Sequence, residues 1–223
     1  MQRHDTNSGM ANSLTDLMTS LAVIFVLLLC ASMHNVRQEG ETSRNAVLSA
    51  VHRELNDFLT QGIQVSQDPK DALSILILVP ENLLAFQFDK ADIPQGGMSF
   101  LKSFIPRLSG ILCSDQFSQE INSVVVEGHT DSSGSPGHNC ELSQRRSMSV
   151  VRASLDILDG DGMVTERERF LKLLSATGRG SAEPIMGLKG AEDMALSRRV
   201  VFKIKVRSIE QRPLNDALGV RTG

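Results

Sequence analysis

The chain has 223 residues, with 23 Lys and Arg against 26 Asp and Glu and a formal net charge of −3 at pH 7. A near-neutral chain without a basic stripe argues against a nucleic-acid partner. The length suits one globular domain of about 130 to 150 residues plus additional segments.

The first part of the chain contains one candidate membrane span. Residues 1–12 form a short polar tail, and the run from Leu17 to Met33 has no charged residue. About 20 residues of helix cross a hydrocarbon core of ~30 Å, so we predict a transmembrane helix over residues 13–34. A cleaved signal peptide or a lipoprotein signal ending at Cys30 is disfavoured, because Asp16 interrupts the apolar run and Leu29 is not small.

An acidic residue, Asp16, lies near the start of this span. On a helix, Asp16, Thr19 and Ser20 fall on one face. A carboxylate near hydrocarbon is costly and has a raised pKa, so Asp16 could bind and release a proton, or hold sodium with the two hydroxyls. The alternative is that Asp16 caps the helix at the interface, where negative charge is favoured. The residues alone leave both interpretations open.

A second helix is predicted directly after the span. Between Asn35 and Thr60, apolar residues recur at helical spacing, and Gly62 and Pro69 follow. We assign residues 35–70 to a linker with a plug-like helix, which could pack on its own domain, pair with a second copy or seal a pore.

Residues 71–208 alternate strand and helix patterns, and residues 209–223 form a C-terminal tail. We predict an α/β (α+β) sandwich with helices on one face of a mixed sheet. The expected strands are residues 74–79, 83–88, 121–127, 171–177 and 199–206, and the expected helices are residues 98–112 and 141–158.

The strongest local signal runs from Val126 to Arg146, where a strand ends in a Gly-containing loop that leads into a helix. This arrangement places the carboxylate of Asp131 and the guanidinium of Arg146 beside one groove. Together they could grip a zwitterion, with Asp131 on an ammonium and Arg146 on a carboxylate. The alternative is an internal ion pair that steadies the loop.

These residues resemble a known family. Gly128-His129-Thr130-Asp131, followed by Asn139, Leu142 and Arg146, is similar to the OmpA-like peptidoglycan-binding domain, as is Ser197-Arg198-Arg199-Val200 with Ser in place of the family's Asn. The resemblance implies that Asp131 and Arg146 hold the diaminopimelate residue of the wall peptide. It also implies that Thr130, Asn139, Leu142 and Arg199 shape that site.

The order of the segments resembles a second family. One N-terminal helix with Asp16 in Leu14-Thr15-Asp16-Leu17-Met18-Thr19, followed by an OmpA-like domain, is similar to the MotB-like stator B subunits of flagellar motors. The short link and the missing basic tail fit better with the B subunits of the Zorya anti-phage defence system.

This second resemblance implies a non-enzymatic, single-pass protein of the bacterial inner membrane, with a cytoplasmic N-terminus and a periplasmic domain. A larger A subunit would form a ring around a homodimer of this chain, and H⁺ or Na⁺ would be transported without a bound cofactor. The alternatives are a flagellar-type stator and a structural wall anchor that transports nothing.

Two further features have open interpretations. Asp159, Asp161 and Glu168 resemble part of a calcium-binding EF-hand, but the same Asp-Gly pairs also favour a plain turn. Cys113 and Cys140 could form a disulfide if the domain lies outside the cytoplasm, or could be two unpaired residues.

Overall fold

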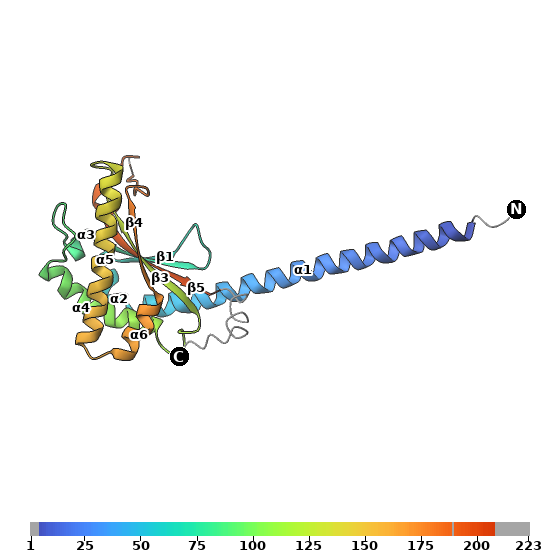
Figure 1. The fold of residues 1–223 in the computed structure, drawn as a ribbon, viewed down its shortest axis with the longest axis horizontal. Helices are drawn as coiled ribbons and strands as arrows, with labels where there is room; N and C mark the ends of the chain where they lie inside the picture. Colours follow the sequence, from blue (N-terminus) through green and yellow to red (C-terminus); the bar gives the residue numbers. More distant parts are fainter. Residues whose placement is uncertain (1–4, 189, 208–223) are drawn as a thin grey trace. The chain divides into compact units, whose positions relative to one another are not determined.

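A computed structural model describes residues 5–188 and 190–207, so the predicted C-terminal tail and the first four residues lie outside the described part. The chain divides into two compact units. Of the described residues, 5–40 belong to one unit and 41–188 with 190–207 belong to the other (Figure 1).

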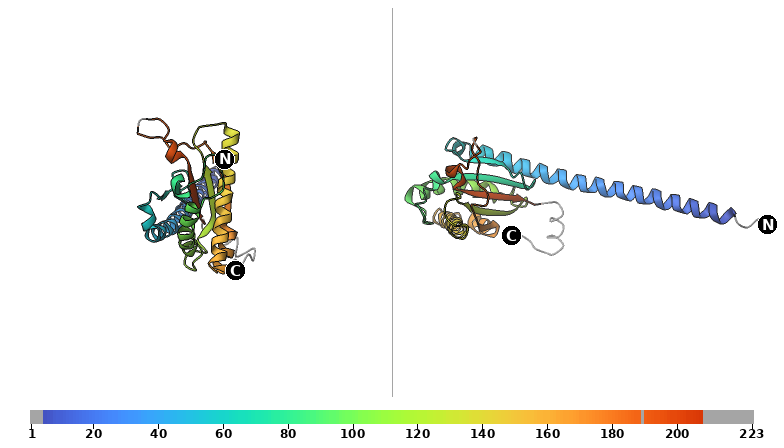
Figure 2. Two further views of the ribbon diagram at one scale, coloured as in Figure 1. Left: turned by 90° about the vertical axis from the view of Figure 1, so that its left-hand side faces the viewer. Right: turned by 90° about the horizontal axis from the view of Figure 1, so that it is seen from above.

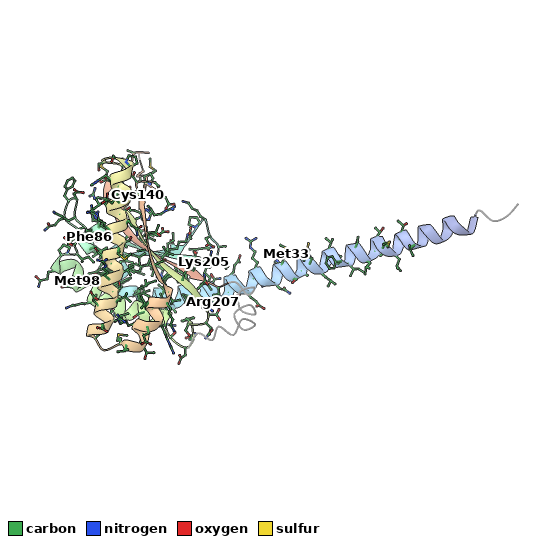
Figure 3. The ribbon with its side chains drawn as sticks, in the orientation of Figure 1. Met33, Phe86, Met98, Cys140, Lys205 and Arg207 are labelled. Atoms are coloured by element: carbon green, nitrogen blue, oxygen red, sulfur yellow. The ribbon has the colours of Figure 1, made fainter. Side chains whose placement is uncertain are left out.

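The first element, α1 (Asp5–Glu54), is a single helix that includes both predicted N-terminal helices. No Pro interrupts residues 5–54, and so nothing forces a break between the apolar stretch and the amphipathic one. Within the described residues it is the one helix long and apolar enough to cross a membrane, judged by length and composition. The side chains of that stretch, including Met33, are exposed (Figure 3).

The last turns of α1 belong to the globular unit. Val47, Val51 and Leu55 are fully buried in its core, and Nη1 of Arg44 donates to the carbonyl of Ala72 at 2.7 Å. Of the three possibilities for this helix, the structure therefore shows packing on its own domain. The globular unit begins at residue 41, not at residue 71 as the sequence suggested.

The core of the globular unit is a five-stranded sheet in the order β1-β2-β5-β3-β4. The strands are β1 (Gln64–Gln67), β2 (Ser74–Pro80), β3 (Ile121–His129), β4 (Leu174–Gly180) and β5 (Arg199–Val206). Only β3 and β4 pair in parallel, and the other neighbours are antiparallel. The predicted mixed sheet with helices is thus confirmed.

Six further helices connect the strands: α2 (Asn56–Leu59), α3 (Glu81–Leu84), α4 (Gln95–Leu112), α5 (Pro136–Gly160), α6 (Val164–Leu173) and α7 (Met194–Ser197). The strand predicted over residues 83–88 was wrong: α3 occupies its start and ends at Ala85, whose φ of 52° is left-handed. The alternating apolar residues that suggested a strand are Leu84 and Phe86. Both side chains are buried, Leu84 at the end of α3 and Phe86 in the loop that follows.

The two faces of the sheet differ in chemistry. On one face, α5 lies so close to β3 that a Cβ at Gly128 would approach the carbonyl oxygen of Ser143 to 2.2 Å. Val126 and Phe202 are buried in the core on this face. Figure 2 shows α5, in yellow and orange, running along this side of the sheet. Since side chains alternate along a strand, Glu127 and His129 face the opposite side, away from α5.

The structure bears on two interpretations that the sequence leaves open. Cys113 and Cys140 are free thiols: Cys113 ends α4 against the carbonyl of Glu166, and Cys140 lies near the N-terminal end of α5 against the carbonyl of Gly178 (Figure 3). Both sulfurs therefore contact different parts of the unit, and the predicted disulfide does not form.

The partial EF-hand is a tight turn between α5 and α6. Asp161 follows the last residue of α5, and Gly162 supplies a φ of +72°. Asp159 pairs with Arg167 at 3.5 Å. In the described part of the chain, Asp159, Asp161 and Glu168 are not among the acidic groups close enough to share a metal ion, so the calcium interpretation was wrong.

Candidate functional site

A cavity of about 540 Å³ lies where β3 ends and α5 begins. Thr130 and Asp131 follow the last residue of β3, and α5 starts after Ser135, whose hydroxyl accepts the backbone N–H of His138. Short elements from elsewhere in the chain complete the walls, namely α3 with the loop after it and α7 with Arg198.

Asp131 sits in this cavity and is only 7% exposed. Its Oδ2 pairs with Nη1 of Arg198 at 2.7 Å, and its Oδ1 accepts the backbone N–H of Ser133 at 3.0 Å and the Ser133 hydroxyl. Burial alone would raise the pKa of Asp131, but the hydrogen bonds from Ser133 and Arg198 outweigh it and hold this pKa below its usual range.

Arg146 also lines the cavity and is 5% exposed. Its Nη1 pairs with Oε1 of Glu81 at 2.9 Å, and its Nε donates to the carbonyl of Lys90 at 2.9 Å. The guanidinium carbon lies 4.9 Å from the ring centroid of Phe86. Burial lowers the pKa of Arg146, and the charge of Glu81 opposes that shift.

Asp131 and Arg146 do not pair with each other. Arg198 joins them, because its Nη1 bonds Asp131 while its Nε bonds Oε2 of Glu81, whose other oxygen holds Arg146. The charges therefore alternate along the wall in the order Asp131, Arg198, Glu81, Arg146. The direct ion pair between Asp131 and Arg146 that was the alternative is therefore not present, and each of the two pairs instead with a residue that the sequence analysis did not name as a site residue.

Arg198 is the functional residue that sequence reasoning missed. Of the two arginines in Ser197-Arg198-Arg199, Arg198 lines the cavity and the predicted Arg199 does not. Arg199 begins β5 and is buried away from this cavity, where its guanidinium donates to the carbonyls of Ser197 and Glu183 at 3.1 Å each. Neighbouring side chains on a strand face opposite sides, and that alternation was the available signal.

The other predicted residues line the cavity as expected from the resemblance. Nδ2 of Asn139 donates to the carbonyls of Asp131 and Ser133, at 3.2 and 2.8 Å, which fixes the loop. Thr130 and Leu142 complete this wall, and the hydroxyl of Thr130 is buried without a hydrogen-bond partner in the described structure.

The mouth of the cavity carries one ion pair and one exposed ring. Nε2 of His138 lies 2.7 Å from Oδ1 of Asp89, which joins α5 to the loop after α3. Phe88 is 97% exposed beside them. An aromatic ring this exposed at a polar cavity offers an apolar contact to a ligand or partner.

The residues predicted to carry an ion lie apart from this cavity, on α1. Asp16, Thr19 and Ser20 follow each other at the spacing of one helix face, and the Thr19 hydroxyl donates to the carbonyl of Thr15 at 2.7 Å.

The chain is similar to known proteins. The OmpA family model matches residues 85–198. The Zorya protein ZorB of Escherichia coli is 28% identical over 208 residues, which cover 86% of each chain. Outer membrane protein A of Escherichia fergusonii is 34% identical over 102 residues, which are 46% of this chain and 35% of that protein.

Among solved structures, a MotB-like protein from Desulfovibrio vulgaris has the same fold. It superposes with a TM-score of 0.55 at 21% identity, over 77% of this chain and 96% of that one.

Proposed function

Because this chain belongs to the OmpA family, we propose that its globular unit binds peptidoglycan and that the whole chain is the wall-anchored B subunit of an ion-driven motor of the Zorya anti-phage type. The observation that carries the proposal is the similarity to ZorB, which covers 86% of each chain, in a chain that also has a helix long and apolar enough to cross a membrane. The proposal assigns no catalytic step to the chain.

The wall ligand in this proposal is the diaminopimelate of a stem peptide, whose free end carries an ammonium and a carboxylate. Asp131 would take the ammonium, and Arg146 the carboxylate. Both side chains already have charged partners, so the ligand must replace Arg198 on Asp131 and Glu81 on Arg146. Such an exchange keeps every buried charge paired, whereas an unpaired buried charge would cost about 3–5 kcal/mol.

We expect this exchange to favour zwitterions, because a zwitterion makes both charged contacts at once. A ligand with only a carboxylate would displace Glu81 and leave Asp131 with Arg198, and a ligand with only an ammonium would do the reverse. When both ends bind together, Arg198 and Glu81 are released together, and their mutual ion pair satisfies them.

Asp16 would carry the ion. In this proposal two copies of α1 lie inside a ring of a larger A subunit, with the N-terminus in the cytoplasm and the globular unit in the periplasm. One ion crossing the membrane supplies ~2.3 kcal/mol per 100 mV. Sodium would additionally use the oxygens of Thr19 and Ser20.

The wall-binding half is tested by sedimentation of the full chain, in detergent, with purified peptidoglycan sacculi. We expect Asp131→Ala to reduce the bound fraction at least ~10-fold, since the loss of one charged contact costs more than 1.4 kcal/mol. Asp115→Ala is the matched control, because that carboxylate is 96% exposed and remote from the cavity. Equal sedimentation of both variants would reject this half.

The ion-carrying half is tested by phage plating on cells that express the chain with its A subunit. We expect Asp16→Asn to abolish protection, while the variant still co-purifies with the A subunit and still binds sacculi. If cells with Asp16→Asn were fully protected, Asp16 would not carry an ion, and the chain would be a structural wall anchor. A flagellar-type stator would be indicated if the chain restored swimming to a stator mutant and gave no protection against phage.

A further inference from the structure

A second polar cleft lies on the open face of the sheet, opposite the helices, and has a volume of about 290 Å³. Its floor is the side of β3 and β5 that α5 does not cover, and the loop that contains Glu183 and Ile185 forms a wall. None of the peptidoglycan-binding assignments uses this cleft, apart from the misassigned Arg199.

His129 is the unusual residue of the cleft. It is only 2% exposed, and both ring nitrogens are buried without a hydrogen-bond partner in the described structure. A buried polar atom without a partner costs about 1–3 kcal/mol. His129 offers two such atoms at one position, which is the strongest sign on this face that a ligand belongs there.

Two carboxylates stand beside that imidazole. Oε2 of Glu127 lies 3.7 Å from Nε2 of His129, and one ligand atom from each of Glu127, His129 and Glu183 lies within 4.8 Å of the others. Two ligands of a tetrahedral zinc ion, each about 2.0–2.1 Å from the metal, are ~3.4 Å apart. The three side chains are therefore near the spacing that a shared ion requires.

The strand and the loop hold these residues in place. Glu127 and His129 are two apart on β3 and so share its open face. Glu183 is brought over them by its loop, whose carbonyl at Glu183 accepts Nη2 of Arg199 at 3.1 Å.

Lysine and arginine side chains near this position would repel a metal ion and compete for the same carboxylates. Their ion-pair partners therefore decide which carboxylate oxygens are available. Lys70 and Arg179 both bond Oε1 of Glu183, at 2.7 Å each, and its Oε2 takes part in neither bond. Lys203 is engaged by Asp68 at 2.5 Å. Arg199 also lines the cleft, and its two terminal nitrogens donate to the carbonyls of Ser197 and Glu183. Among the described residues, the ion pairs within 4 Å include no Lys or Arg on Glu127, whose contact at that range is the His129 ring. The carboxylate of Glu127 and Oε2 of Glu183 thus remain to bind a cation.

We propose that His129, Glu127 and Glu183 form a zinc site on the open face of the sheet, with one imidazole nitrogen and two carboxylate oxygens as ligands. The fourth position opens to the cleft and takes water. The bound ion gives the His129 ring the partner that it lacks and ties the Glu183 loop to the end of β3. This site does not depend on the wall-binding proposal.

The test uses the full chain in detergent, stripped with a chelator, dialysed against zinc chloride and analysed for metal by mass spectrometry. We expect one zinc per chain. Glu127→Gln should lower the affinity at least ~10-fold, because a neutral amide replaces an anionic ligand. Circular dichroism of the variant establishes that it is folded. His129→Gln is the second ligand variant, and His52→Gln is the control, since His52 is exposed on α1.

Cobalt chloride in place of zinc provides an independent readout of geometry. The wild type should develop visible d–d bands of a tetrahedral site, and a folded Glu127→Gln variant should not. The proposal is overturned if the wild type retains no zinc after dialysis. It is equally overturned if Glu127→Gln and His129→Gln bind as much zinc as the wild type, or if His52→Gln loses it.

Discussion

At the scale of single residues, the cavity is organised by Arg198. Its side chain bonds two carboxylates from distant parts of the chain, Asp131 after β3 and Glu81 at the start of α3. The carbonyl of Arg198 also accepts the backbone N–H of Glu81 at 3.2 Å. These bonds raise the pKa of Arg198 further, first through Asp131 and then through Glu81.

Arg198→Ala should therefore destabilise the globular unit by about 2 kcal/mol. The side chain is 37% exposed, so the loss is smaller than the ~3–5 kcal/mol of a fully buried pair. Urea unfolding followed by circular dichroism measures the change. Arg145→Ala is the control, since its exposed pair with Glu141 is worth only ~0.3–0.5 kcal/mol. Equal losses in the two variants would contradict the central role of Arg198.

The cysteines give a prediction that depends on pH. Burial raises the pKa of the Cys113 thiol to about 11, with Arg169 opposing the shift. The unfolded chain loses this proton near pH 9 and the folded chain only near pH 11, so stability from Cys113 is full below pH 9 and falls as the pH rises towards 11.

At pH 8, Cys113 should therefore resist iodoacetamide in the folded protein, while the exposed Cys140 reacts. Peptide mass spectrometry after timed quenching gives both rates in one sample. In urea, both cysteines should react at similar rates. Fast labelling of Cys113 without denaturant would show that the end of α4 is open in solution.

At the scale of elements, the long amphipathic patterns were predictable and the short elements were not. The ranges of β2, α4, β3 and β5 follow from the spacing of their apolar residues. Each of these elements buries one face against a neighbouring layer, and that burial sets the spacing. The strand β1 and the helices α3 and α7 have four residues each, too few for a period to be seen, and α3 was mistaken for a strand.

The difference between long and short elements also explains which residues of the cavity the sequence could group together. Asp131, Asn139 and Leu142 lie in one continuous strand–loop–helix segment, so local sequence was enough to group them. Glu81 and Arg198 come from short elements and reach the cavity only through tertiary packing.

Close contact between α5 and the sheet also depends on glycine. A Cβ on Gly128 would lie 2.2 Å from the carbonyl oxygen of Ser143, which is backbone and cannot turn aside. Gly128→Ala should cost about 1–3 kcal/mol or more, as overpacking does, and should displace the helix that carries Arg146. Gly137→Ala is the control, since nothing lies within 4 Å of its Cβ. Thermal melts of both variants decide the matter.

At the scale of the whole molecule, the globular unit includes the end of α1. The spacing of apolar residues predicts an amphipathic helix there, but it does not predict which surface covers the apolar face. A helix that packs on its own domain and a helix that packs on a second copy have the same apolar spacing. The structure assigns it through Val47, Val51 and Leu55, all fully buried, and through Phe58, which packs edge-on against Phe104 at 5.5 Å.

A soluble fragment of residues 41–207 should therefore fold, and one of residues 71–207 should not. Loss of each large buried side chain costs about 2–5 kcal/mol, and several together exceed the usual stability of a domain. Heteronuclear NMR spectra of the two fragments provide the comparison. Dispersed spectra for the shorter fragment would show that residues 41–70 are dispensable.

The neighbouring arginines that follow Ser197 serve opposite surfaces of one sheet, the first towards the ligand cavity and the second towards the cleft around His129. Loss of a single residue from the stretch between Asp193 and Arg198 would shift both arginines by one position, so that only one of the two surfaces would still receive an arginine. Homologues should consequently vary the chemistry of this short connection freely while keeping its length unchanged.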